Sequence, residues 1–192
     1  MRPEGSIRGL SSTPSIALPG CPPLTAEFVR RALDAVRTSV GVGLEFDSDT
    51  LPLVDHYLKG VPKGSADASA LIAAMIGSYF GEAVRQTIGG QWKVEEDDPA
   101  SWRIVLPGGL SFSPVRLTLA AILRDEEGEG NADFQAPPKL MLVLEESMER
   151  MGSVSRHEYF TLSCRFDTLE HLQEVLLAAA ADMQAAREKN AN

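Results

Sequence analysis

The sequence is poor in the residues that form disulfides and bind transition metals. Its 192 residues include two cysteines, Cys21 and Cys164, and three histidines. Two cysteines cannot form a disulfide framework, and these two lie in unlike contexts, a Pro-rich segment and an apolar run. We therefore expect reduced thiols without a catalytic role, in a cytoplasmic protein.

Catalytic and cofactor motifs are also missing. The histidines, His56, His157 and His171, lie in three separate predicted elements and match no zinc-site spacing. No G-x-S-x-G element accompanies the serines, and the glycine-rich positions lack the spacing of a P-loop or dinucleotide site. We predict no catalytic residue, no cofactor and no metal, and hence a non-enzymatic protein.

Positive charge and long apolar runs are scarce as well. The chain has 18 Lys and Arg against 27 Asp and Glu, a net charge of -9. Binding to phosphate needs clustered Lys and Arg, so we expect no nucleic acid and no anionic membrane as partner. No run of 18 apolar residues occurs, and the N-terminus lacks the continuous apolar segment of a signal peptide.

Hydrophobic residues make up 44% of the chain, enough for one core. Residues 1–23 carry five prolines among serines and glycines, a composition that buries little surface and is typical of disorder. We predict a flexible tail over 1–23 and a single α+β domain over 24–190.

The segment 65–92 predicts one long, largely buried helix that ends at a double glycine. Ser65 is a suitable N-cap, and Gly89 can adopt the left-handed conformation that closes a helix. Gly77 and Gly81 share an arc with Ala70, Ala73 and Ala74, where the lack of bulk would let another backbone approach closely. The large apolar side chains recur at helical spacing, namely Leu71, Ile72, Met75, Ile76, Tyr79, Phe80, Val84 and Ile88.

The elements before and after this helix are predicted from caps, periodicity and turn residues. The first half should contain a helix that Thr25 caps and that runs to about Val40, a short strand at 44–46, and a helix capped by Asp47 or Ser48 with Pro52 near its first turn. After the central helix follow a hairpin with Trp92 and Trp102 on its buried face, a third strand at 110–115 ended by Pro114, and a helix from Arg116 to Glu127.

The last third is predicted as an acidic connection, a helix, a strand and a helix. Residues 125–133 are acidic, with a solvated loop favoured over a cation site, and residues 139–152 match a helix. The alternation over 158–166 predicts the strongest strand after the hairpin, and Asp167 with Glu170 resembles a capping box for the final helix. The whole is an α+β fold of about five helices packed on a small, mainly antiparallel sheet.

The pattern G-x-Y-x-G-E-x-x-R runs from Gly77 through Tyr79, Gly81 and Glu82 to Arg85, and Gly89-Gly90-Gln-Trp92 follows it. With the hairpin and the segment 112–115, residues 44–124 resemble a loose group of uncharacterised bacterial proteins with this core. Val115 stands where the pattern has an aromatic residue, and the region after 130 is not covered. The resemblance implies a domain without an established activity, in a group of which some members look like small cytoplasmic partner or immunity-type proteins.

The candidate binding or structural polar residues are Tyr79, Gly81, Glu82, Arg85 and Trp92. Glu82 could form an ion pair with Arg85, clamp the glycine turn or hairpin, or act as a shielded acid. Trp92 and Trp102 could stack on a ligand, although packing in the core is the favoured interpretation.

Three functional hypotheses follow from these observations. The leading one is a cytoplasmic bacterial protein that binds another protein, as an adaptor, an immunity-type inhibitor or an assembly component. The first alternative is a small-molecule or enzymatic pocket around Glu82. The second is a structural homodimer through the Ala-rich C-terminal helix, whose small side chains suit contact with a partner helix.

Overall fold

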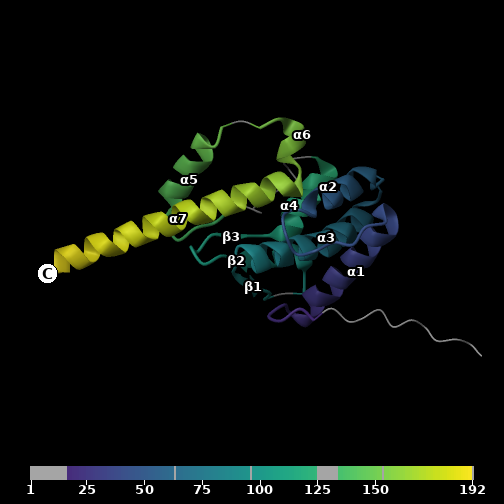
Figure 1. The fold of residues 1–192 in the computed structure, drawn as a ribbon, viewed down its shortest axis with the longest axis horizontal. Coiled ribbons are helices and arrows are strands. Elements are labelled where there is room, and N and C mark those ends of the chain that lie inside the picture. The colour runs from purple at the N-terminus through teal and green to yellow at the C-terminus, as the bar shows by residue number, and fades with distance from the viewer. Residues whose placement is uncertain (1–16, 63, 96, 125–133, 153, 192) are drawn as a thin grey trace, which may run out of the picture.

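The computed structural model describes residues 17–62, 64–95, 97–124, 134–152 and 154–191 (Figure 1). In this part of the chain the elements are α1 (Pro23–Val40), α2 (Leu51–Gly60), α3 (Ala66–Thr87), β1 (Gln91–Lys93), the 3-10 helix η1 (Pro99–Ser101), β2 (Arg103–Val105), β3 (Ser111–Phe112), α4 (Pro114–Leu123), α5 (Met141–Arg150), α6 (Arg156–Tyr159) and α7 (Leu162–Ala191). The predicted α+β class is confirmed, because helices dominate and the three strands form one small antiparallel sheet.

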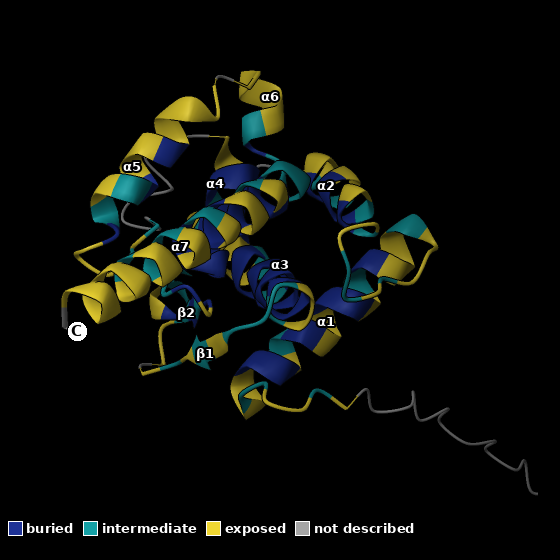
Figure 2. Ribbon diagram, turned by 60° about the vertical axis from the view of Figure 1, so that its left-hand side comes forward, coloured by how far each residue is buried: buried dark blue, intermediate teal, exposed yellow. Residues whose placement is uncertain are grey.

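Helix α3 is the buried centre of the fold, as predicted. The Ser65 hydroxyl accepts a hydrogen bond from the Ala68 N–H and caps its first turn, and Gly89 follows the helix with φ of 98°. Helices α1 and α4 pack against it, and Figure 2 shows most of its ribbon as buried. Its apolar residues belong to the same core as those of the hairpin and α7.

The sheet has the order β1-β2-β3, with both pairs antiparallel. Trp92 lies opposite Ile104, and Ile104 lies opposite Phe112. The predicted hairpin and third strand are therefore confirmed. Pro114 does more than end the strand, because it begins α4 behind an N-cap formed by Ser113, a position at which proline is preorganised for a helix.

Three predictions in the first half are wrong. Helix α2 begins at Leu51 after the N-cap Thr50, so neither Asp47 nor Ser48 is its N-cap. Helix α1 begins at Pro23 after the N-cap Pro22, so Thr25 lies inside the first turn, fully buried, instead of capping it. Residues 44–46 form no strand. Their backbone is held by side chains instead, since the Thr50 hydroxyl donates to the Glu45 carbonyl and the Phe46 ring packs on Tyr79.

The predicted strand at 158–166 is also wrong, because these residues end α6 and begin α7. Ser155 and Glu158 form a capping box that starts α6. The apolar residues Leu162, Phe166 and Leu169 then lie fully or almost fully buried at helical spacing. Asp167 is consequently inside α7, and the capping box expected there with Glu170 is not formed.

The last two long helices pack on each other, α5 against α7. Helix α5 confirms the helix predicted over 139–152. Helix α7 is buried through Leu176, whereas its last turns extend beyond the other elements and are exposed (Figures 1 and 2).

The predicted tail and acidic loop fall mostly outside the described residues, which omit 1–16 and 125–133. Within the rest of the 1–23 segment, Leu18 packs against the core and Pro23 begins α1. None of the helices in the described ranges is long and apolar enough to cross a membrane.

Candidate functional site

The Glu82 carboxylate lies at the middle of the predicted site and is fully buried. Arg85, one turn further along α3, donates to both of its oxygens, from Nε to Oε2 over 2.9 Å and from Nη2 to Oε1 over 2.6 Å. This two-point contact is the strong geometry for an arginine and a carboxylate. The predicted ion pair is therefore present, and it is fully shielded from solvent on the carboxylate side.

Two further donors complete the shell of Glu82. Gln86 Nε2 donates to Oε1 over 2.8 Å, and Trp92 Nε1 donates to Oε2 over 3.0 Å. Because Trp92 belongs to β1, the last bond joins the sheet to α3. We refer to Glu82, Arg85, Gln86 and Trp92 as the Glu82 cluster.

Burial of Glu82 alone would raise its pKa, but the hydrogen bonds from Arg85, Gln86 and Trp92 outweigh burial and hold the pKa below its ordinary value. The carboxylate is thus ionised near neutral pH, with both oxygens occupied by protein donors. A general acid or base needs a pKa near the working pH and access to a substrate, and Glu82 has neither a raised pKa nor an exposed oxygen.

The absence of a side chain at Gly81 makes room for Trp92. A Cβ at Gly81 would lie 2.8 Å from Trp92 Cζ2 and 2.9 Å from Pro114 Cγ. These separations are too short for carbon atoms, so any larger residue would displace the indole that bonds Glu82. Gly81 therefore belongs to the site as a spacer.

Gly77, one turn earlier, allows the close approach of α4 that the sequence predicts for this arc. A Cβ here would lie 2.6 Å from Val115 Cα and 2.9 Å from the Pro114 carbonyl oxygen. The first turn of α4 is therefore seated directly on the backbone of α3. Together with the room that Gly81 leaves for Trp92, this contact explains why a helix at the centre of the core contains two glycines despite their low helix propensity.

Arg85 also binds the segment that precedes α1. Its Nη2 donates to the Pro19 carbonyl over 2.9 Å, and the Cys21 thiol lies against the Glu82 carboxylate. Burial and the negative charge of Glu82 raise the pKa of Cys21 to about 12, so the thiol is protonated at neutral pH and poorly nucleophilic. The cluster consequently links three segments: the N-terminal side of α1, helix α3 and the hairpin.

Tyr79 is not part of this arrangement, although the sequence groups it with Glu82. Its hydroxyl donates to the Glu45 carbonyl and lies 3.0 Å from the Thr50 hydroxyl. Burial raises the pKa of Tyr79 to about 12. From its position on α3, Tyr79 therefore holds the loop before α2 in place.

Trp102 is fully buried and packs edge-on against Phe28, with 5.9 Å between the ring centroids.

Sequence reasoning missed Gln86, Cys21 and Asp55. Asp55 in α2 is buried, and its carboxylate accepts from the N–H of Leu162 over 2.7 Å and from the N–H and hydroxyl of Ser163 over 3.2 and 2.6 Å. It caps α7 from a position more than 100 residues earlier in the chain, so no local spacing indicates the contact. Gln86 alone offered a local signal, since it lies four residues after Glu82.

Metal-binding geometry is not found in the described parts of the chain, where no three His, Cys, Asp or Glu side chains gather. Both cysteines are free thiols. The fold and the Glu82 cluster thus define a helical α+β protein with a saturated, buried ion pair at its centre. Comparison with protein-family models, curated proteins and solved structures finds no match for this chain.

Proposed function

We propose that the protein acts in the bacterial cytoplasm by binding another protein, through the outer surface of α5 and the projecting end of α7. The observation that carries this proposal is the exposure of large apolar side chains on α5 and at its C-cap. Leu142 is 66% exposed, Met148 44% and Met151 39%. Exposed apolar surface of this kind is typical of protein-binding sites, and methionine side chains adapt to the shape of a partner.

The packing of α5 uses only part of its apolar circumference. Leu144 and Ser147 are buried toward the domain, whereas Leu142 projects from the opposite side of the helix. Val154, just after α5, and Leu177 on α7 are exposed as well. Five of the nine large apolar side chains exposed in the described ranges therefore lie on α5, on the connection after it and on α7.

The end of α7 adds a second element to this surface. Residues 184–190 are exposed, and a helical segment this short gains little stability by itself in water. Its alanines at 181, 185 and 186 would let a partner helix approach closely. A partner that covers these turns as well would stabilise them.

The contacts of the Glu82 cluster favour a structural role for these residues over binding of a ligand. Any ligand there would have to replace one of four hydrogen bonds from Arg85, Gln86 and Trp92 to a carboxylate without exposed surface. The homodimer through α7 is a second candidate, favoured by the exposed end of that helix.

Affinity isolation of the tagged protein from its native cells tests the proposal. The wild-type protein should recover one other protein in about the same molar amount as itself. The double variant Leu142→Ser with Met148→Gln should no longer recover that protein. A control with Val42→Ser and Leu71→Ser, which removes equally exposed apolar groups elsewhere, should retain it. Recovery of the wild type alone, or equal recovery by both variants, would reject the proposal, and a concentration-dependent dimer in sedimentation would favour the homodimer.

A further inference from the structure

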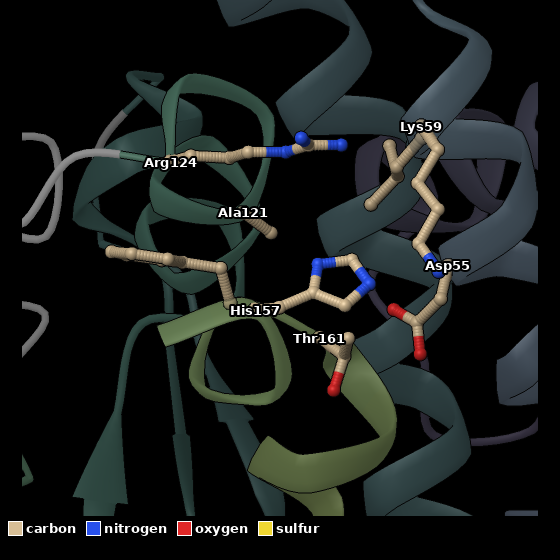
Figure 3. A pocket seen from close by; sticks show the side chains of 8 residues that line it. Asp55, Lys59, Ala121, Arg124, His157 and Thr161 are labelled. Atoms are coloured by element: carbon tan, nitrogen blue, oxygen red, sulfur yellow. The ribbon is translucent and has the colours of Figure 1, made fainter. Parts of the chain in front are cut away.

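A hollow separate from the Glu82 cluster lies where α2, α4 and the α6–α7 junction meet (Figure 3). Its volume is about 20 Å³, which is enough for about one water molecule or one small polar group. Leu58, Ala121 and Phe160 supply an apolar wall. The remaining lining is polar or charged, and it comes from segments far apart in the sequence.

Three basic side chains surround this hollow. Lys59 lies in the last turn of α2, Arg124 ends α4, and His157 belongs to α6. In Figure 3 the side chains of Arg124 and His157 extend toward α2, where Lys59 lies. None of the three forms an ion pair with a carboxylate of the described residues.

The lining also contains one acidic residue, Asp55. Both carboxylate oxygens of Asp55 accept hydrogen bonds from the first turn of α7. The positive end of the α7 dipole therefore offsets part of the charge of Asp55. In a chain of net charge -9, the hollow thus brings two cations, Lys59 and Arg124, together with the imidazole of His157.

Arg124 occupies an unusual backbone position. It is the only non-glycine residue with positive φ in the described ranges, with φ of 54° and ψ of 39° at the C-cap of α4. Glycine or asparagine is the usual residue there, because a larger side chain disfavours the left-handed conformation. A cation at a helix C-terminus is favourable, which accounts for positive charge on Lys59 and Arg124 but not for their convergence with His157 on one hollow.

We propose that this basic hollow binds a single oxyanion, a carboxylate or phosphate group. Arg124 and Lys59 supply charged donors, and His157 supplies a third N–H. The small volume admits about one oxygen of such a group and excludes burial of a nucleotide or other large ligand. Arginine recognises both kinds of oxyanion through paired N–H donors, so the chemistry is shared between a free anion and an acidic group of a larger molecule.

The test is an NMR titration of the full-length protein with sodium phosphate and, separately, with sodium acetate, against sodium chloride at matched ionic strength. The imidazole signals of His56, His157 and His171 are read together, since all three side chains are exposed. A saturable shift confined to His157 is expected. Saturation with phosphate alone would assign a phosphate group, and saturation with acetate as well would assign any small oxyanion.

Two variants separate binding from folding. Arg124→Gly relieves the left-handed backbone, so it should fold at least as stably as wild type while its affinity for phosphate falls tenfold or more. Arg37→Gln, which removes an exposed arginine on α1, should leave the affinity unchanged. An equal shift of all three histidines, the same shift with chloride, or full affinity in Arg124→Gly would overturn the proposal. Because no partner protein is needed, this outcome is independent of the proposed function.

Discussion

The indole N–H of Trp92 donates to Glu82 Oε2 over 3.0 Å, and this bond ties the hairpin to the central helix. The same carboxylate is held by Arg85, which also donates to the Pro19 carbonyl. One buried acid therefore joins the hairpin, α3 and the segment before α1. Glu82 is therefore a structural joint between these segments.

Glu82→Gln should destabilise the fold by about 1–3 kcal/mol, because it removes the charge that accepts from Arg85 and leaves polar groups imperfectly paired in the core. Urea unfolding followed by tryptophan fluorescence measures the change. The matched control is Glu146→Gln, which breaks an exposed ion pair with Arg150 and should change stability by no more than about 0.5 kcal/mol. Equal effects of the two variants would contradict a structural role of Glu82.

The stability that Glu82 contributes to the fold should fall as the pH is lowered. Its pKa in the folded protein is below the ordinary value of 4.5, so the unfolded chain takes up the proton at a higher pH than the folded one. The stabilisation is therefore complete well above pH 4.5 and is lost as the pH falls through the folded pKa. Urea unfolding of wild type and Glu82→Gln at pH 7 and at successive pH values below 4.5 measures this change. The difference in stability between the two proteins should shrink as the pH falls. A constant or growing difference would refute the prediction.

Gly77→Ala should cost about 1–3 kcal/mol or more, because the new methyl group would meet the backbone of Val115 and force α3 and α4 apart. Gly60→Ala is the control, since nothing lies within 4 Å of its Cβ position and its φ is not positive. There alanine should leave the stability unchanged or raise it by up to about 1 kcal/mol. Thermal unfolding of both variants checks the pair, and a neutral Gly77→Ala would show that the helices do not approach so closely.

Asp55→Ala should destabilise the protein by about 1–2 kcal/mol, because the first turn of α7 loses its cap. Hydrogen exchange should show the amides of Leu162 and Ser163 less protected than in wild type. Asp34→Ala, an exposed change on α1, should stay within about 0.5 kcal/mol. Unchanged protection at Leu162 would mean that Asp55 does not cap the helix.

The sequence predicts much of the central part of the fold because the information there is local. Ser65, the apolar periodicity and the glycine arc of α3 each act within one helix, and the arc correctly indicates where another backbone approaches. Glu82 and Arg85 were paired correctly for the same reason. The sequence also offers a clamp from Glu82 to the hairpin as one alternative, which agrees with the bond to Trp92, whereas the contact with Pro19 depends on the tertiary fold.

The strand predicted at 158–166 is wrong because a short alternation of apolar residues fits both a strand and a helix. One face of a strand would contain Phe160, Leu162 and Phe166. One face of a helix contains Leu162, Phe166 and Leu169 equally well. The Ser155 and Glu158 capping box was the local signal that favours the helix. The cap from Asp55, on the other hand, comes from a distant helix, and no local pattern in the sequence indicates it.

Site-specific photo-crosslinking in native cells tests the central claim, that the outer surface of α5 binds another protein. A photoreactive residue is placed at position 142, and for comparison at position 71, whose leucine is 50% exposed on α3. The account predicts one covalent adduct of defined mass from position 142 and none from position 71. Absence of an adduct at 142, the same adducts from both positions, or an adduct only with a second copy of this chain would contradict it.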